Sequence, residues 1–240
     1  MSNAVSSTDQ SKNPALAISD LRFRYGGADS FGIEISSLSL APGEQMLLTG
    51  GSGTGKSTLL QIIAGLVEPS HGSVLVAGRN IHSMHGAARD RFRGAHIGMI
   101  FQTFNLLLGF TASENVLAAL MFSDLPKNEH NQRAVNLLHS LGIERINASV
   151  ETLSVGQQQR VAVARAVACR PALVLADEPT ASLDPENSAA AIELIQRTCR
   201  ENGSALLCTS HDPAIKSRFE RVESLEAIRF GSGRGAGVGA

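Results

Sequence analysis

The residues with the clearest chemical meaning lie between Gly50 and Thr58. Residues 50–57 fit the spacing G-x-x-x-x-G-K-[S/T], in which glycines let successive backbone N–H groups turn inward around a phosphate. A lysine and a hydroxyl at the end of such a loop supply a cation for phosphate oxygens and a ligand for Mg²⁺. We therefore expect a phosphate site made of Gly50, Gly51, Ser52, Gly53, Thr54, Gly55, Lys56, Ser57 and Thr58. The alternative is a glycine-rich turn that carries an exposed lysine.

Two adjacent carboxylates follow an apolar run later in the chain. Residues 172–176 read Ala-Leu-Val-Leu-Ala, and Asp177 and Glu178 come directly after them. An acid at the end of a buried strand can reach a Mg²⁺ ion beside Ser57, and the next acid can orient or deprotonate an attacking water. Asp177 is therefore a candidate metal ligand and Glu178 a candidate general base. A solvated acidic loop is the alternative interpretation of this pair.

Short apolar runs predict the strands that must position these groups. Residues 44–49 contain a short apolar run, and residues 172–176 and 205–209 are nearly continuously apolar; the last two runs are separated by a segment with helical spacing. This pattern favours buried parallel strands joined by a crossover helix. Residues 17–25 and 31–40 alternate apolar and polar side chains, as half-buried strands do.

The strand signal nearly vanishes between about residues 103 and 153. Residues 114–122 and 130–142 have helical spacing instead, so we expect a helical insert within an α/β core. The first fifteen or so residues are rich in Ser, Asn and Asp, and the last ten are mostly Gly and small residues. Both ends are expected to be flexible tails.

The overall composition is that of an ordinary globular protein. The chain has 240 residues, of which 43% are hydrophobic, and a formal net charge of -1, so bulk electrostatics gives no support for binding nucleic acid. Cys169, Cys199 and Cys208 are odd in number and widely spaced, which favours reduced core residues. The N-terminus lacks a charged start followed by an apolar run, and no long apolar run follows, so neither export nor membrane insertion is expected.

Residues 153–166 complete the pattern with Leu-Ser-Val-Gly-Gln-Gln-Gln-Arg-Val-Ala-Val-Ala-Arg-Ala. Ser154 and Gln157 form an S-x-x-Q capping box at the start of a predicted helix, whose N-terminus can accept an anion. With the phosphate loop and the acidic strand end, this segment resembles the signature of the ATPase subunits of ABC transporters. The resemblance runs from about residue 17 to about residue 228.

The resemblance implies a fold and a domain organisation. The fold is an α/β P-loop NTPase core with a parallel sheet flanked by helices, an N-terminal antiparallel β subdomain and an inserted α-helical subdomain at about 103–158. The ATPase domain would cover residues 16–230, between a tail at 1–15 and a tail at 231–240.

The resemblance also implies residue roles around the nucleotide. Gln102 matches a glutamine that ligates Mg²⁺ and senses the membrane partner, and His211 matches a histidine that contacts the γ-phosphate. Tyr25 matches an aromatic residue that stacks on adenine, although a strand tyrosine at the core edge is the alternative. A single Gln or His is usually structural, and only the place of these two in the series of motifs supports their roles. The implied catalytic set is Lys56, Gln102, Glu178 and His211, and the implied metal ligands are Ser57, Gln102 and Asp177.

A second group of implied roles belongs to a dimer. Ser154, Gly156 and Gln157 would bind ATP held by a second copy of the chain, and Asp184 matches a loop that crosses the dimer interface. The family usually has two glycines where this chain has Val155 and Gly156. A β-branched residue resists positive φ and adds bulk near the phosphate, which predicts a looser contact at Val155.

The implied function is that of an ATP-binding and ATP-hydrolysing ABC transporter subunit, with ATP and Mg²⁺ as cofactors. It would act as a homodimer attached to transmembrane permease subunits, peripheral on the inner, cytoplasmic face of the cell membrane, without nucleic acid as a partner. Residues 97–116 resemble the corresponding region of the lipoprotein-releasing and macrolide-export type, which favours export or extraction of hydrophobic cargo.

Three alternatives stay open. An amino-acid or ion importer has a similar sequence in residues 97–116. A soluble ABC-type ATPase acting on nucleic acid or ribosomes usually carries two ATPase units or a long coiled-coil insertion, and neither is evident here. A P-loop kinase would need an acceptor site and a lid, and the signature-like segment argues against it.

Overall fold

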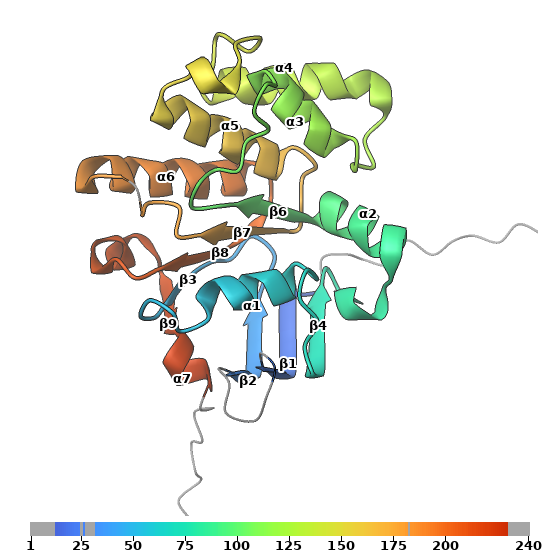
Figure 1. The fold of residues 1–240 in the computed structure, drawn as a ribbon, viewed down its shortest axis with the longest axis vertical. Helices are drawn as coiled ribbons and strands as arrows, with labels where there is room; N and C mark the ends of the chain where they lie inside the picture. Colours follow the sequence, from blue (N-terminus) through green and yellow to red (C-terminus); the bar gives the residue numbers. More distant parts are fainter. Residues whose placement is uncertain (1–12, 25, 27–31, 182, 230–240) are drawn as a thin grey trace, which may run out of the picture.

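The computed structural model describes residues 13–24, 26, 32–181 and 183–229, which form two sheets and the helices around them (Figure 1). One sheet is parallel, with strand order β6-β7-β8-β3-β9. The other is antiparallel, with strand order β2-β1-β4-β5. The strands are β1 (Leu16–Arg24), β2 (Gly32–Leu40), β3 (Gln45–Thr49), β4 (His71–Val76), β5 (Arg79–Asn80), β6 (Ile97–Ile100), β7 (Leu173–Asp177), β8 (Ala205–Ser210) and β9 (Arg221–Ser224).

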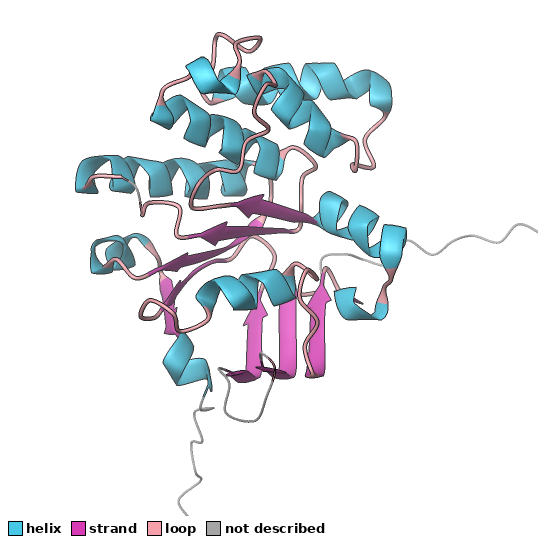
Figure 2. Ribbon diagram, in the orientation of Figure 1, coloured by secondary structure: helices cyan, strands magenta, loops and turns pink. Residues whose placement is uncertain are grey.

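The α-helices cover both faces of the parallel sheet (Figure 2). They are α1 (Lys56–Ile63), α2 (Gly86–His96), α3 (Ala112–Leu120), α4 (His130–Ser140), α5 (Val155–Val167), α6 (Pro185–Glu201) and α7 (Leu225–Arg229). Helix α1 lies between the parallel and the antiparallel sheet, whereas α5 and α6 pack on the opposite face, with α3 and α4 packed against α5 (Figure 1).

Strands β7 and β8 separate two hydrophobic cores because successive side chains of a strand point to opposite faces. In β7, Leu173 and Leu175 pack with α1 and the antiparallel sheet, whereas Val174 packs with the helices on the other face. In β8, Leu207 and Cys208 divide in the same way. These strands are buried on both faces, and their sequences are therefore continuously apolar instead of alternating.

Helix α5 approaches the parallel sheet closely at strand β6. A Cβ added to Gly98 would lie 2.1 Å from the carbonyl oxygen of Ala166, so only glycine allows this contact. Helix α5 also packs against α3 and α4, so it connects these two helices to strand β6.

The strands predicted at 17–25, 31–40, 44–49, 172–176 and 205–209 are confirmed within one residue at most of their ends. Strands β7 and β8 are parallel neighbours, and α6 is the predicted crossover helix between them. Within residues 103–153 the described chain has no strand, only an isolated bridge between Thr111 and Ser149. Helix α5 starts at Val155 and continues to Val167, beyond the predicted end of the helical insert.

Two predictions from composition concern described residues. All three cysteines are free; Cys199 and Cys208 are buried, and Cys169 is half-buried. Among the described residues, no helix combines the length and the apolar character that a membrane crossing requires. The predicted tails at 1–15 and 231–240 lie almost entirely outside the described residues.

Candidate active site

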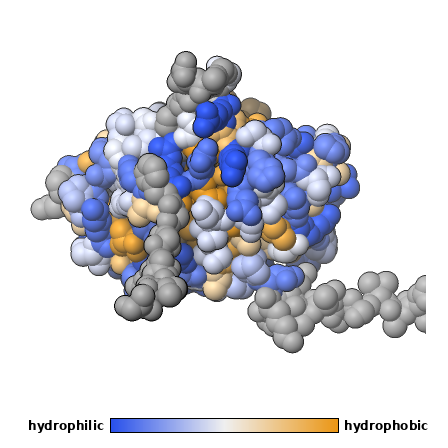
Figure 3. Space-filling model, turned by 90° about the horizontal axis from the view of Figure 1, so that it is seen from below, coloured by the Kyte–Doolittle hydropathy of each residue, from blue (hydrophilic) through white to orange (hydrophobic). Residues whose placement is uncertain are grey.

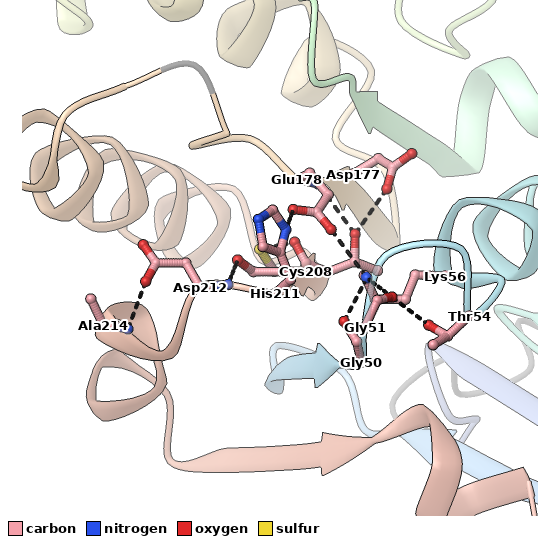
Figure 4. A network of polar contacts seen from close by, with 12 residues as sticks. Gly50, Gly51, Thr54, Lys56, Asp177, Glu178, Cys208, His211, Asp212 and Ala214 are labelled. Carbon is pink, nitrogen blue, oxygen red and sulfur yellow. Dashed lines mark hydrogen bonds and ion pairs between the residues drawn. The ribbon is translucent and has the colours of Figure 1, made fainter.

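The parallel sheet brings the predicted groups together at one edge. Strands β3, β6, β7 and β8 run in the same direction, so the residues after their carboxyl ends meet there. The phosphate loop follows β3, and Gln102 follows β6. Asp177 ends β7, Glu178 comes next, and His211 follows β8. Residues separated by more than 150 positions in the sequence therefore share one site (Figure 4).

The phosphate loop has the backbone shape that its glycines predict. Gly53 has φ of 76° and Gly55 has φ of 102°, both in the left-handed region that favours glycine. Gly55 is also the N-cap of α1 and makes no side-chain cap. The positive end of the helix dipole at this N-terminus favours an anion such as a phosphate.

Lys56 is almost completely buried, with 5% of its surface exposed. Its Nζ donates hydrogen bonds to the carbonyl oxygens of Gly50 at 2.8 Å and Gly51 at 2.9 Å. The same Nζ lies 3.1 Å from Oε1 of Glu178. These contacts rule out a turn with an exposed lysine, because the ammonium group is held over the loop and beside the acid.

Glu178 occupies an unusual backbone conformation. Its φ is 46°, which is uncommon for a residue with a side chain, and such strain is concentrated at functional sites. Only 13% of its side chain is exposed, so the acidic pair is not a solvated loop. Its Oε2 lies 2.5 Å from Nδ1 of His211, which has more than half of its side chain exposed. One carboxylate therefore connects a buried cation with an exposed imidazole (Figure 4).

A threonine on β8 completes the acidic strand end, and the sequence analysis did not identify it. Thr209 is fully buried and pairs with Asp177 in the β7–β8 register. Its hydroxyl donates a hydrogen bond to Oδ1 of Asp177 at 2.9 Å. The backbone N–H of Glu178 donates to the carbonyl oxygen and to the hydroxyl of Thr209, both at 3.2 Å. The only signal in the sequence was a polar residue at the end of an otherwise apolar strand.

A cavity of about 490 Å³ lies beside these residues. It is lined by Ser52, Gly53, Gly55, Lys56, Ser57, Thr58, Gln102, Glu178 and His211, all of them members of the predicted set. Another cavity of about 490 Å³ contains none of that set; it lies where α2 and the loop before β7 approach each other. The convergence of a glycine loop, a lysine, a histidine and an acid makes the first cavity the candidate nucleotide site.

The signature segment lies elsewhere in the same chain. Ser154 caps α5 as predicted: its hydroxyl accepts the N–H of Gln157 at 3.3 Å, and its own N–H donates to the Gln157 side chain at 3.0 Å. Ser154 and Gly156 are exposed and do not line the Lys56 cavity. Both ends of the implied ATP sandwich are therefore present in one chain but apart from each other.

The backbone argument about Val155 is wrong. Val155 is the first residue of α5 and does not have a positive φ, so a β-branched side chain meets no strain there. Its side chain is exposed, so the argument from bulk applies unchanged. A Cβ on Gly156 would also meet no atom within 4 Å in the single chain.

The last two predicted site residues are Asp184 and Tyr25. Asp184 is the N-cap of α6 and accepts the N–H of Asn187 at 3.0 Å, a role that the Asp-Pro sequence at 184–185 could have indicated. Tyr25 lies outside the described residues.

The candidate metal ligands suit Mg²⁺. Ser57 and Gln102 line the cavity, and Asp177 lies at the strand end beside Glu178. They offer a hydroxyl, an amide and a carboxylate oxygen, the hard ligands that Mg²⁺ prefers. No cluster of three His, Cys, Asp or Glu residues suited to a metal occurs in the described chain. Mg²⁺ typically takes few protein ligands and completes its shell with phosphate oxygens and water, so a full protein cage is not needed.

The sequence comparison identifies the family of the chain. A family model described as ABC transporter matches residues 33–181, more than half of the sequence. The chain belongs to the ABC transporter family. A similar protein is the ABC transporter ATP-binding protein YtrE of Bacillus subtilis (strain 168). It is 40% identical over 182 residues, which cover 75% of this chain and 79% of YtrE.

Solved structures agree with this assignment. The chain is similar to a dimeric post-hydrolysis state of the ATP-binding cassette MJ0796 bound to ADP and Pi, with 31% identity and a TM-score of 0.73. That match covers 87% of this chain and 93% of the other. It is also similar to cbiO1 from Clostridium perfringens, part of the ABC transporter complex cbiONQ, with 27% identity and a TM-score of 0.78 over 89% and 85% of the chains. The predicted fold class is confirmed, and this ABC protein is an ATP-binding ATPase subunit.

Proposed function

We propose that this ABC ATPase works as a homodimer that sandwiches two Mg²⁺–ATP and passes its closure to membrane permease subunits. The observation that carries the proposal is the buried Lys56–Glu178 pair beside the phosphate loop and His211. A lysine, an acid and a histidine around one cavity provide phosphate binding, activation of water and stabilisation of charge on the transferring phosphoryl group.

Each residue has a separate task in this proposal. The loop 50–55 and the first turn of α1 bind the phosphates, and Lys56 moves from its contact with Glu178 to the terminal phosphate oxygens. Glu178 is then free to take a proton from the attacking water. His211 donates toward the transferring phosphoryl group and holds Glu178 in place through the second carboxylate oxygen. Tyr25 would stack on adenine.

The proposed metal ligands are Ser57, Gln102 and Asp177. Mg²⁺ held there would neutralise charge that develops on the phosphate oxygens. The three protein groups would fix its position relative to Lys56 and Glu178.

The dimer is supported by the separation of the signature segment from the Lys56 cavity. Ser154 and Gly156 are exposed at the N-terminus of α5, where the helix dipole favours an anion, and they do not line the Lys56 cavity of their own chain. Two copies arranged around a twofold axis would place this helix end over the partner's ATP. The dimeric form of the related cassette with ADP and Pi is consistent with this arrangement.

A permease partner is supported by exposed apolar side chains after Gln102. Leu107, Leu108 and Phe110 are more than two fifths exposed, and they belong to the chain between β6 and α3. The end of the molecule seen in Figure 3 also has a hydrophobic patch, near its centre and surrounded by hydrophilic surface. A movement of a protein bound at residues 107–110 would be passed to Gln102 through the few residues of chain between them. Such an attachment would place the protein on the cytoplasmic face of the membrane.

The proposed cargo class is hydrophobic and exported or extracted from the membrane, as the resemblance of residues 97–116 implies. Uptake of amino acids or ions is the other transport direction in the same family. The partner proteins distinguish extraction from uptake. A permease with a large extracytoplasmic domain fits extraction, and an accompanying solute-binding protein fits uptake. Isolation of the native complex by a tag on this chain, followed by mass spectrometry, identifies that permease.

Phosphate release from ATP tests the catalytic part of the proposal. Lys56→Ala is expected to abolish ATP binding and hydrolysis, whereas Lys127→Ala, at an exposed position remote from the cavity, should behave like the wild type. Hydrolysis by Lys56→Ala at a rate near that of the wild type would contradict the proposal. Recovery of ribosomes or nucleic acid instead of a permease would contradict the transport part.

A further inference from the structure

The hydroxyl of Thr209 lies between the two acids of the site without lining the cavity. The side chain is fully buried on β8, directly opposite Asp177 in the register of β7 and β8. Most of this strand is apolar, and the residues just before the pair, Ala176 in β7 and Cys208 in β8, pack in the hydrophobic core on the side of α5 and α6. A hydroxyl at this position therefore forms hydrogen bonds with protein groups and not with solvent.

That hydroxyl makes one contact with each acid. It donates to Oδ1 of Asp177 at 2.9 Å, which is shorter than its 3.4 Å distance to the carbonyl oxygen of Ala176. Because a hydroxyl has a single hydrogen, Asp177 is the preferred acceptor. The oxygen of the same hydroxyl accepts the backbone N–H of Glu178 at 3.2 Å. Thr209 thus connects the side chain of one acid to the backbone of the other.

Each contact constrains a group that the reaction needs. With Oδ1 of Asp177 engaged, Oδ2 is the oxygen left to face a metal ion. Glu178 has φ of 46°, a strained conformation that persists only when surrounding contacts hold it. The hydroxyl and the carbonyl oxygen of Thr209 are the two acceptors of its N–H.

We propose that Thr209 is a positioning residue that orients Asp177 toward Mg²⁺ and fixes the backbone of Glu178. This inference rests on the proposed function, because it assigns a support for the metal ligand and for the base. Thr209 itself touches neither nucleotide nor metal. Outer partners of metal ligands typically contribute about 10- to 100-fold to metal affinity or activity.

Two substitutions at Thr209 and one elsewhere separate positioning from packing. Thr209→Val keeps the shape and removes the hydroxyl, whereas Thr209→Ser keeps the hydroxyl and removes a methyl group. Thr198→Val is the matched control, since Thr198 is also buried but donates its hydroxyl to Leu194 within α6. The measurements are Mn²⁺ binding in the presence of ADP by electron paramagnetic resonance, ADP binding in EDTA, and the Mg²⁺ dependence of phosphate release.

The expected result is a loss of metal affinity without a loss of nucleotide binding. Thr209→Val should weaken Mn²⁺ binding about tenfold or more and raise the half-saturating Mg²⁺ concentration equally, with ADP binding in EDTA unchanged. Thr209→Ser and Thr198→Val should stay within about threefold of the wild type, a change below the tenfold effect of an outer partner. Should Thr209→Val fail to fold, Thr209→Ala takes its place: a loss of Mn²⁺ binding of about tenfold supports the proposal, and binding like the wild type contradicts it.

The proposal is overturned if Thr209→Val binds Mn²⁺ like the wild type, or if Thr209→Ser is as impaired as Thr209→Val. The second outcome would show that packing, not the hydroxyl, is responsible. Failure of the proposed function looks different, because wild-type protein would then release no phosphate and bind no ADP.

Discussion

Replacing Glu178 with Gln removes the proposed base while keeping the size of the side chain. General bases contribute about 10²- to 10⁴-fold to a rate, so turnover of ATP should fall at least about a hundredfold. The amide cannot accept the proton of water, although it can still contact His211 and Lys56. The defect is therefore expected in turnover at saturating ATP and not in nucleotide binding.

The same substitution should make ATP bind more tightly. Glu178 Oε1 lies 3.1 Å from Lys56 Nζ, and both side chains are largely buried. Two unit charges at this distance attract by about 5 kcal/mol at an effective dielectric constant of about 20, but desolvation offsets much of this. A hydrogen bond between charged groups contributes about 1.5–3 kcal/mol net. Lys56 must give up this contact to bind phosphate, and the neutral amide of Gln holds it less strongly than the carboxylate, so ATP affinity should rise by up to about tenfold.

Two assays separate these effects: phosphate release at saturating ATP, and equilibrium titration with ATP in the presence of Mg²⁺. The control is Glu201→Gln, because Glu201 is exposed at the end of α6 and pairs with Arg197 away from the cavity. Turnover by Glu178→Gln within threefold of the wild type would show that Glu178 is not the base. Unchanged ATP affinity would show that the Lys56–Glu178 pair does not oppose binding.

Three further predictions concern the signature helix and the cysteines. Ser154→Ala removes the cap of α5 and should lower the free energy of unfolding by about 1 kcal/mol in chemical denaturation. Ser154→Ala should also reduce ATP turnover. The control is Thr111→Ala, which removes the matching capping box of α3 and should lower stability only. Equal turnover in the two variants would contradict the role of Ser154. Val155→Gly removes bulk from the exposed start of α5 and should promote ATP-dependent dimerisation in light scattering, and an unchanged dimer fraction would remove steric bulk as a cause. Burial raises the pKa of Cys169 to about 11 and that of Cys199 to about 12, and burial also raises the pKa of Cys208. These thiols are therefore protonated at neutral pH and should react slowly with iodoacetamide, which mass spectrometry of the labelled protein measures. Rapid labelling of native protein at pH 7 would contradict this prediction.

Local patterns in the sequence predict the parts of this structure that depend on neighbouring residues. Each of these features is determined by residues a few positions apart: the glycines of the phosphate loop, the apolar runs of β7 and β8 and the capping box at Ser154. Strand β9 and helix α2 were not predicted, because β9 is short and only Phe92 and Ala95 of α2 are buried. Such elements give little periodicity.

Contacts between distant residues account for what the sequence does not predict. The pairing of Lys56 with Glu178 and the bond from Thr209 to Asp177 exist only because β3, β7 and β8 are neighbours in the sheet. The error about Val155 has a different origin. The glycine that the family usually has before Gly156 suggested a positive φ at this position. The backbone at Val155 is instead ordinary helix, in which φ is negative.

Complementation between two inactive variants tests most directly whether the site is completed across a dimer. One variant carries Lys56→Ala and the other carries Ser154→Arg, which blocks the helix end with a large side chain. A mixed dimer contains one site with an intact Lys56 loop facing an intact Ser154, so mixing the two proteins should restore phosphate release that neither shows alone. A mixture as inactive as its components, although mixed dimers form, would show that each chain completes its own site.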